Sequence, residues 1–188
     1  MTKLRRRTIS LALCVLGSCA IVLAQGPEIP APAAETHQLD PLLGKWKFWE
    51  HLNIPNLPPK IFGEWTFRSA GDGHMVMDEF RAFNGAGRTA YLGLSYRVYD
   101  LNTKKWDFEF TDLQFSAVGD APKNVWTRGT STALGNEVVD DVTTPGKITR
   151  GRIHNIRGNR FECEWEHSID GGKTWASDGH LEAERVAE

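Results

Sequence analysis

The sequence has few cysteines and none of the common metal-binding or nucleophile motifs. Of its three cysteines, Cys14 and Cys19 lie within the first 24 residues, so only Cys163 remains beyond them and no internal disulfide framework is expected. The six histidines show neither an H-x-H nor an H-E-x-x-H spacing, which argues against a structural zinc site. A G-x-S-x-G elbow and a phosphate-binding glycine loop are also missing. We therefore expect neither a metal nor a cofactor.

An excess of positive charge is also missing. The whole chain has a formal net charge of −2. Removal of residues 1–24 takes away four positive charges and no negative ones, which leaves 18 Lys and Arg residues against 24 Asp and Glu residues, a charge of −6. Because an acidic surface is repelled by a phosphate backbone, we do not expect a nucleic acid as partner.

The first 24 residues have the pattern of an export signal. Lys3 and Arg5 to Arg7 form a basic start, an apolar core follows, and Val22-Leu23-Ala24 precedes a cleavage point before Gln25. The apolar run of 16 residues is shorter than the roughly 20 that a membrane-spanning helix needs. A second route is open, because VLGSC at 15–19 resembles the bacterial lipobox, which would make Cys19 a lipid anchor. We expect a periplasmic or secreted protein, and we favour soluble export over lipidation.

Residues 25–39 and 40–188 differ in composition. The first segment, QGPEIPAPAAETHQL, has three prolines and almost no large apolar side chain, which predicts a disordered tether. The second consists of short alternating runs separated by Gly, Asn, Asp and Pro, and sustained helical periodicity is missing apart from one turn around Leu39–Leu43. We predict strands at 44–51, 61–69, 75–83, 89–100, 106–112, 125–133, 138–143, 148–156, 160–168 and 176–186. Ten meandering strands favour an all-β, antiparallel meander closed into a barrel, because closure leaves no unpaired edge.

Alternation within the predicted strands assigns side chains to an inward face. Glu50 falls in line with the aromatic residues Trp46 and Phe48, so we expect it near a rim or with a partner, because an unpaired buried carboxylate is costly. Other inward sets are Trp106, Phe108 and Phe110 in one strand and Phe161, Cys163, Trp165 and His167 in another. Seven Trp, nine Phe and three Tyr exceed what a small core requires. Rings beyond the packed core would line an apolar cavity of the kind that binds small molecules.

Charged residues on three consecutive predicted strands could meet at one end of the barrel: Asp78, Glu79, Arg97 and Asp112. A carboxylate beside Arg in an apolar pocket has its pKa pulled in opposite directions by the two surroundings. Such a group could carry out acid–base chemistry or form an ion pair that closes the mouth of the barrel, and we favour the ion pair. The Pro-rich segment 53–59 could gate this mouth or form a stiff surface loop.

The segment SIDGGKTW at 168–175 matches the Asp-box pattern of sialidase propellers. The carboxylate of Asp170 can accept backbone N–H groups of the turn, Gly172 permits a positive φ, and Trp175 begins the returning strand. A propeller needs several blades of roughly 40–50 residues, and the 164 residues that follow the signal cannot hold six. We therefore predict that the single copy is a structural hairpin clasp.

Two features at opposite ends of the strand pattern resemble lipocalin-like (calycin) barrels. LLGKW at 42–46 resembles the G-x-W entry of these barrels, in which Trp46 would plug the closed end, and Arg185 matches the basic residue that packs across it. From about Leu39 to Val186 the chain looks like a broad bacterial family of lipocalin-like proteins of unknown function. The matching residues include Asp78-Glu79, the stretch LSYRVYD at 94–100, Asp112 and the SIDGGKTW hairpin. The resemblance implies a barrel and does not imply a reaction.

The resemblance does not extend to haem binding. The haem-binding nitrobindin branch has further glycines after its G-x-W and uses a late His as iron ligand. Where that branch has glycines after its G-x-W, this sequence has Lys47-Phe48-Trp49. Alternation places the late His180 on the strand face opposite to that of Leu181.

Together these patterns predict an exported β-barrel protein that binds a small apolar or amphipathic ligand. Two alternatives stay open: a calycin-type cyclase or isomerase acting on a small apolar substrate, and a structural envelope lipoprotein with a filled barrel. The candidate ligand-binding residues are Glu50, Glu79, Arg97, Phe108, Phe110, Asp112, Trp165 and His167. The candidate structural residues are Trp46, Arg185, Asp170, Gly172 and Trp175.

Overall fold

A computed structural model describes residues 29–53, 58, 60–114 and 126–187 of the chain. The chain divides into two compact units, Met1–Pro30 and Ala31–Glu188, and the second contains every strand described below. The predicted signal peptide, Cys19 and most of the Pro-rich segment 53–59 lie outside the described residues. No helix in the described part of the chain is long and apolar enough to cross a membrane.

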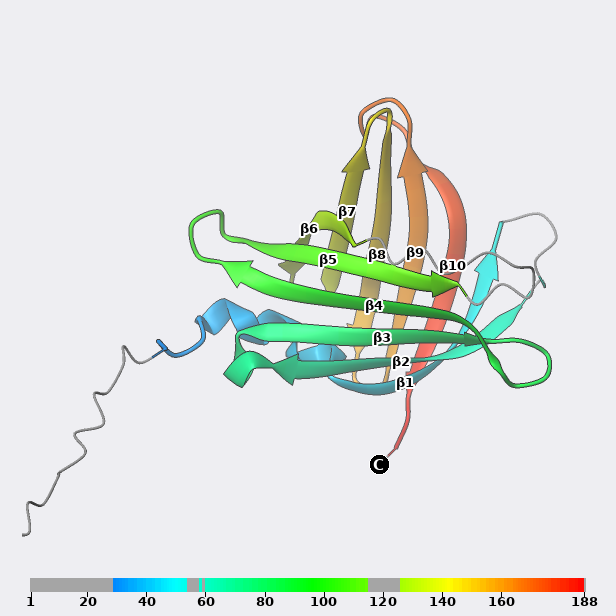
Figure 1. The fold of residues 1–188 in the computed structure, drawn as a ribbon, viewed down its shortest axis with the longest axis horizontal. Helices are drawn as coiled ribbons and strands as arrows, with labels where there is room; N and C mark the ends of the chain where they lie inside the picture. Colours follow the sequence, from blue (N-terminus) through cyan, green and yellow to red (C-terminus); the bar gives the residue numbers. More distant parts are fainter. Residues whose placement is uncertain (1–28, 54–57, 59, 115–125, 188) are drawn as a thin grey trace, which may run out of the picture. The chain divides into compact units, whose positions relative to one another are not determined.

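Ten antiparallel strands form a closed barrel in which each strand pairs with its neighbours in sequence and β1 pairs with β10 (Figure 1). The strands are β1 (Gly44–Leu52), β2 (Ile61–Ala70), β3 (Met75–Phe83), β4 (Thr89–Asp100), β5 (Lys105–Gln114), β6 (Thr127–Leu134), β7 (Glu137–Thr144), β8 (Lys147–Arg157), β9 (Arg160–Ser168) and β10 (Ala176–Arg185). Two short 3-10 helices accompany them, η1 (Ala34–Leu42) and η2 (Gly71–Gly73). The predicted all-β meander closed into a barrel is confirmed.

In the predicted disordered tether 25–39, residues 34–39 instead belong to a short helix, and residues 25–28 lie outside the described residues. Ala34–Leu42 forms η1, and the side chains of Leu39 and Leu42 are each 1% exposed within the hydrophobic core. The hydroxyl of Thr36 donates a hydrogen bond to the carbonyl oxygen of Ala33, 2.7 Å away, at the start of this helix. Two leucines three residues apart lie on one side of a helical turn, so the helix buries both. The end of this helix overlaps the turn that we expected around Leu39–Leu43.

One end of the barrel is closed by η1 and the beginning of β1. Trp46 is fully buried, and its indole N–H donates to the carbonyl oxygen of Leu42, 2.7 Å away. Trp46 lies opposite Arg185 in the β1–β10 register, and the guanidinium carbon of Arg185 is 4.1 Å from the centre of the indole ring. The same guanidinium donates to the carbonyl oxygens of Leu43 and Pro41. These contacts join the first strand, the last strand and η1 into one closed end.

The core beneath this closed end is packed with large apolar side chains. The edge of Trp46 meets the ring of Phe161, with centroids 4.6 Å apart and planes at 66°. Cys163 is fully buried, and burial raises the pKa of its thiol well above the ordinary value, so the thiol is not a thiolate nucleophile at neutral pH. Other core residues are Phe67, Trp106, Val138, Ile153, Leu181 and Ala183.

The hairpin between β9 and β10 has the geometry of an Asp-box turn. The carboxylate of Asp170 accepts the backbone N–H of Thr174 at 2.9 Å and its hydroxyl at 2.7 Å. These hydrogen bonds lower the pKa of Asp170 to about 2. Gly172 adopts a φ of 86°, and its carbonyl oxygen accepts the indole N–H of Trp175 at 3.2 Å. Asp170, Gly172 and Trp175 therefore have local structural contacts.

Candidate functional site

A cavity of about 790 Å³ lies inside the barrel. Its wall is formed by the inward faces of several strands, because alternate side chains of each strand point into a barrel. The aromatic lining consists of Trp65, Phe80, Phe83, Tyr91, Phe108, Phe110 and Trp165. The aliphatic lining includes Leu52, Ile61 and Val142. Cavities of this size with mostly apolar walls are the ordinary form of a small-molecule site.

The aromatic rings of the wall pack against one another. Trp165 lies stacked beside Trp65, with centroids 6.2 Å apart and planes at 30°, and it meets Phe80 edge-on. Phe108 and Phe110 are two residues apart on β5, and their rings stack with centroids 5.8 Å apart and planes at 18°. Mutual packing fixes the rings in position, so the wall offers fixed apolar surfaces on several sides of the cavity.

Glu50 supplies a carboxylate to this aromatic cavity. It lies on β1 on the same face as Trp46 and Phe48, and only 5% of its surface is exposed. One carboxylate oxygen, Oε1, accepts the indole N–H of Trp165 at 2.6 Å. Burial raises the pKa of Glu50 to about 7, although the hydrogen bond from Trp165 acts in the opposite direction. Glu50 can therefore hold or release a proton near neutral pH.

A glycine on the neighbouring strand makes room for the Trp165 ring. Gly151 on β8 is the register partner of Trp165 on β9. A Cβ atom at position 151 would lie 2.7 Å from Cζ3 of the indole, which is closer than real side chains approach. Gly151 thus permits the ring to lie over β8 with its N–H directed to Glu50.

A buried ion group forms a second polar part of the wall. Arg97 on β4 is 2% exposed, and its guanidinium contacts Asp78 on β3 and Asp140 on β7, each at 2.5 Å. Burial alone would lower the pKa of Arg97, but the charges and hydrogen bonds of Asp140 and Asp78 together raise it. The pairing places two carboxyl groups against the guanidinium inside the barrel, where an unpaired charge would be costly.

The remaining hydrogen bonds of this ion group are also satisfied. Asp78 accepts the indole N–H of Trp65 at 2.8 Å and the hydroxyl of Ser95. The guanidinium of Arg97 stacks over the ring of Phe108, 4.7 Å from its centroid. Because its members hold one another through several contacts, the group is a rigid part of the cavity wall.

Five of the sequence-predicted ligand-binding residues line the cavity. They are Glu50, Arg97, Phe108, Phe110 and Trp165. We expected that four charged residues on three consecutive strands could meet at one end of the barrel. The structure joins two of them, Asp78 and Arg97, and the third member of the group is Asp140. The contacts of Arg97 with Asp78 and Asp140 are ion pairs, which is the alternative that we favoured over acid–base chemistry.

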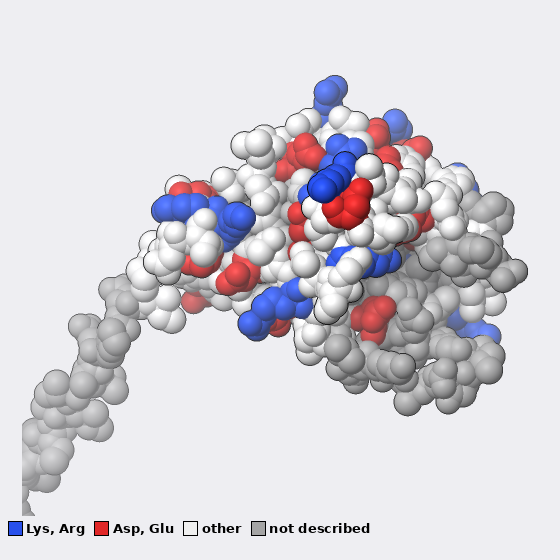
Figure 2. Space-filling view, turned by 90° about the horizontal axis from the view of Figure 1, so that it is seen from above, with Lys and Arg blue, Asp and Glu red and all other residues white. Residues whose placement is uncertain are grey.

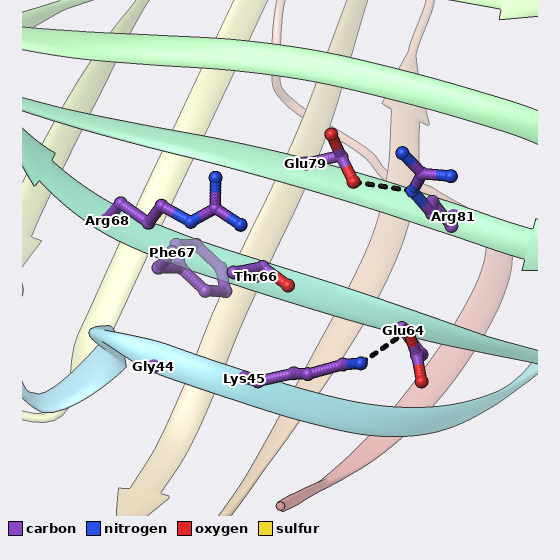
Figure 3. Close-up of a pocket in the computed structure, with 8 residues that line it drawn as sticks. All are labelled: Gly44, Lys45, Glu64, Thr66, Phe67, Arg68, Glu79 and Arg81. Carbon is purple, nitrogen blue, oxygen red and sulfur yellow. Dashed lines mark hydrogen bonds and ion pairs between the residues drawn. The ribbon is translucent and has the colours of Figure 1, made fainter.

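The other three predicted ligand-binding residues are not among the lining residues. Glu79 points to the outer face, where its carboxylate pairs with Arg81 at 2.5 Å, because its neighbour Asp78 takes the inward position (Figure 3). His167 bonds through Nδ1 to Asp178 at 2.8 Å, and Asp178 itself lines the cavity. Asp112 faces Gly93 across the β4–β5 register.

Sequence reasoning missed Asp140, Trp65, Phe80 and Tyr91 in the cavity wall. Asp140 could have been found from the sequence, because alternation places it between Val138 and Val142 on the buried face of β7. Glu50 was found from the same kind of pattern beside Phe48. Tyr91 is a neutral phenol, because burial and then the negative charges of Asp112 and Glu50 raise its pKa.

A smaller hollow of about 390 Å³ lies over β1, β2 and β3 (Figure 3). Its lining is largely charged, and Lys45 pairs with Glu64 at 2.8 Å while Arg81 pairs with Glu79. On the face shown in Figure 2, cationic and anionic side chains are interspersed in the described part of the surface. Paired surface charges offer less binding free energy than an apolar cavity, so the interior cavity is the candidate site. Within the described ranges, no three His, Cys, Asp or Glu side chains are grouped to hold a metal ion.

Similar folds occur among solved structures. The S-type phycobiliprotein lyase CPES from Guillardia theta matches with a TM-score of 0.53 and 10% identity, over 84% of this chain and 99% of the lyase chain. A redesigned β-barrel matches with a TM-score of 0.43 and 11% identity, over 80% of this chain and 96% of the designed chain. No protein-family model and no curated protein matches the sequence. At these identities the likeness to the lyase concerns the fold alone, and the chain is a closed ten-strand antiparallel barrel with an aromatic interior.

Proposed function

We propose that the protein binds a small apolar or amphipathic molecule inside its barrel. The observation that supports this proposal is the aromatic cavity of about 790 Å³. Its volume falls in the range of roughly 300–1,000 Å³ that small-molecule sites occupy. A filled barrel, as expected for a purely structural lipoprotein, would have no such space, so the cavity favours the binding function.

The cavity combines the two properties that an amphipathic ligand needs. The rings of Trp65, Phe80 and Phe110 offer apolar surface to the body of the ligand. Glu50 also lines the cavity and offers a carboxyl group that can orient its polar part. Few polar groups among many apolar ones give specificity with little cost in desolvation.

A binding titration with a cavity-filling variant tests the proposal. The neutral fluorescent probe 1-pyrenemethanol is added to the protein, and binding is followed by probe fluorescence anisotropy. Val142 is buried in the wall of β7, so Val142→Trp should fill the cavity and weaken binding by about tenfold or more. Thr143 is exposed on the outer face of the same strand, so Thr143→Trp should bind within about twofold of the original protein. Equal binding by the two variants, or none by the original protein, would contradict the proposal.

A second function, acid–base catalysis, is favoured by the position of Glu50. A buried carboxyl with a pKa of about 7 inside a substrate-sized cavity has the properties of a general base near neutral pH. We propose the cyclase or isomerase class as the alternative. The methyl protons of 1-acetylpyrene in D₂O, followed by NMR, should exchange faster with the original protein than with Glu50→Gln. Exchange at the rate of buffer alone with both proteins would remove this alternative.

We also propose that the protein is exported, on the basis of residues 1–24. Mass spectrometry of the mature N-terminus distinguishes the routes. A chain beginning at Gln25 supports soluble export, and a lipid-modified Cys19 supports an envelope anchor. A chain that retains Met1 would contradict export.

A further inference from the structure

The charges that line the cavity are predominantly negative. The described lining contains four carboxylates, from Glu50, Asp78, Asp140 and Asp178, against the single guanidinium of Arg97. A surplus of carboxylates in an apolar enclosure creates a negative potential, and such a potential attracts cations and repels anions.

The one cation of the wall is not available to an anionic ligand. The Nε, Nη1 and Nη2 atoms of Arg97 each donate to a carboxylate, at 3.2 Å and 2.5 Å to Asp140 and at 2.5 Å to Asp78. An anionic ligand could reach this guanidinium only by displacing a buried carboxylate, which would then lose its partner. The Arg97 group is therefore a closed unit that leaves no positive site for a carboxylate or phosphate.

Glu50 differs from the other carboxylates because one of its oxygens can still accept a hydrogen bond. Both oxygens of Asp78 and both oxygens of Asp140 accept hydrogen bonds. Asp178 pairs with His167, and 36% of its side chain is exposed to water. Glu50 is 5% exposed, its Oε1 accepts from Trp165, and its Oε2 has no hydrogen-bond partner in the described part of the chain.

We propose that the cavity selects protonated alkylamines, which are amphiphiles with an aromatic or aliphatic body and a cationic N–H donor, and that Glu50 receives this donor. The inference rests on the proposed binding function and adds the chemical class of the ligand. An ammonium group beside Glu50 would neutralise its charge and fill the open acceptor position. A carboxylate ligand of the same shape would meet the repulsion of the surrounding carboxylates.

The proposal also predicts how binding depends on pH. Tyr91 on β4 and Cys163 on β9 interact electrostatically with Glu50, and both have raised pKa values, so they stay neutral near neutral pH. The other charged groups of the described wall are Arg97, which pairs with Asp78 and Asp140, and Asp178, which pairs with His167. A protonated Glu50 must release its proton to bind an ammonium group as an ion pair. Affinity for an amine should therefore rise as pH increases from about 5 to about 8.

Three probes of matched shape test the proposal: 1-pyrenemethylamine, 1-pyrenemethanol and 1-pyrenecarboxylate. At about pH 8 we expect the amine to bind at least about tenfold more tightly than the alcohol, and the carboxylate to bind most weakly. In Glu50→Gln, the amine should fall to the affinity of the alcohol and lose its pH dependence, while the alcohol changes by about twofold or less.

A matched control exists on the outer face. Glu182 also accepts an indole N–H, from Trp49 at 3.2 Å, but its side chain is exposed. Glu182→Gln should leave the amine preference unchanged. If the alcohol binds but the amine has no advantage, or keeps it in Glu50→Gln, the amine proposal is overturned while the binding function stands. If none of the three probes binds, both are overturned.

Discussion

Each end of the barrel contains a tryptophan that contacts a charged or ionisable side chain, but one end is packed and the other encloses a cavity. At one end the Trp46 ring lies under the guanidinium of Arg185, and the leucines of η1 fill the space beneath it. At the other, Trp165 donates to Glu50, and the rings around this pair enclose an open volume of about 790 Å³. The inward face of each strand is set by alternation, but whether that face encloses a solid core or a cavity depends on a segment outside the strands.

The ends also differ in where charge is placed. Arg185 at the filled end contacts backbone carbonyls and the face of an indole. The hollow end contains Glu50, Asp78, Arg97 and Asp140, each no more than 8% exposed. Buried charges cost folding free energy unless they are paired. Asp78, Arg97 and Asp140 pair with one another, so among these four groups Glu50 is the one whose carboxyl has no cationic partner in the described part of the chain.

The largest expected effect separates the packing of the two ends. Trp46→Ala should lower the free energy of unfolding by about 4–5 kcal/mol, because the ring is fully buried and its loss leaves a cavity. Phe110→Ala should cost only about 1–2 kcal/mol, because its partly buried ring already faces open space. Urea denaturation measures both values. Equal losses would show that the cavity end is packed as tightly as the closed end.

The next largest effect is the difference in stability that is lost when a buried and an exposed ion pair are broken. Arg97→Gln should cost about 3–4 kcal/mol, because it leaves Asp78 and Asp140 buried without a cation. Arg160 pairs with Glu184 at 2.5 Å on the surface, so Arg160→Gln should change stability by less than about 1 kcal/mol. Denaturation of the two variants at low and high salt provides the comparison. A loss of less than about 1 kcal/mol in Arg97→Gln would mean that the group is solvated.

A smaller effect depends on pH. The pKa of Glu50 in the folded protein, about 7, lies above the ordinary value of 4.5, so between these values the folded chain retains a proton that the unfolded chain has lost. Stability therefore falls as pH rises from about 4.5 to about 7, by at most about 3 kcal/mol, and stays reduced above that. Glu50→Gln should recover this loss at about pH 8 and change little at about pH 4, as measured by thermal unfolding. A gain that is the same at both pH values would contradict the burial of an ionisable Glu50.

The smallest effect concerns the cation at the closed end. Arg185→Leu should cost about 1–2 kcal/mol, since it removes the stacking on Trp46 and the hydrogen bonds to Pro41 and Leu43. Binding of 1-pyrenemethanol should be unchanged, because Arg185 does not line the cavity. A variant of unchanged stability but weakened binding would show that the two ends are coupled.

The fold could be predicted because its signals are local. A period of two and the turn residues between runs placed ten strands with bounds close to those observed. The site was harder because its contacts cross the barrel, as in the Arg97–Asp140 pair between β4 and β7. On β3 apolar residues occur on both faces, since Met77 is 47% exposed while Val76 is buried, so the sequence could not decide between Asp78 and Glu79.

A crystal structure of the protein with 1-pyrenemethylamine tests the central claim most directly. We expect the pyrene ring among Phe80, Phe110 and Trp165, with the amine within hydrogen-bonding distance of a Glu50 oxygen. Glu50→Gln crystals treated in the same way should show the probe at lower occupancy, with its amine no longer held at position 50. A cavity filled by its own side chains, with the probe bound only on the outer surface, would contradict the account.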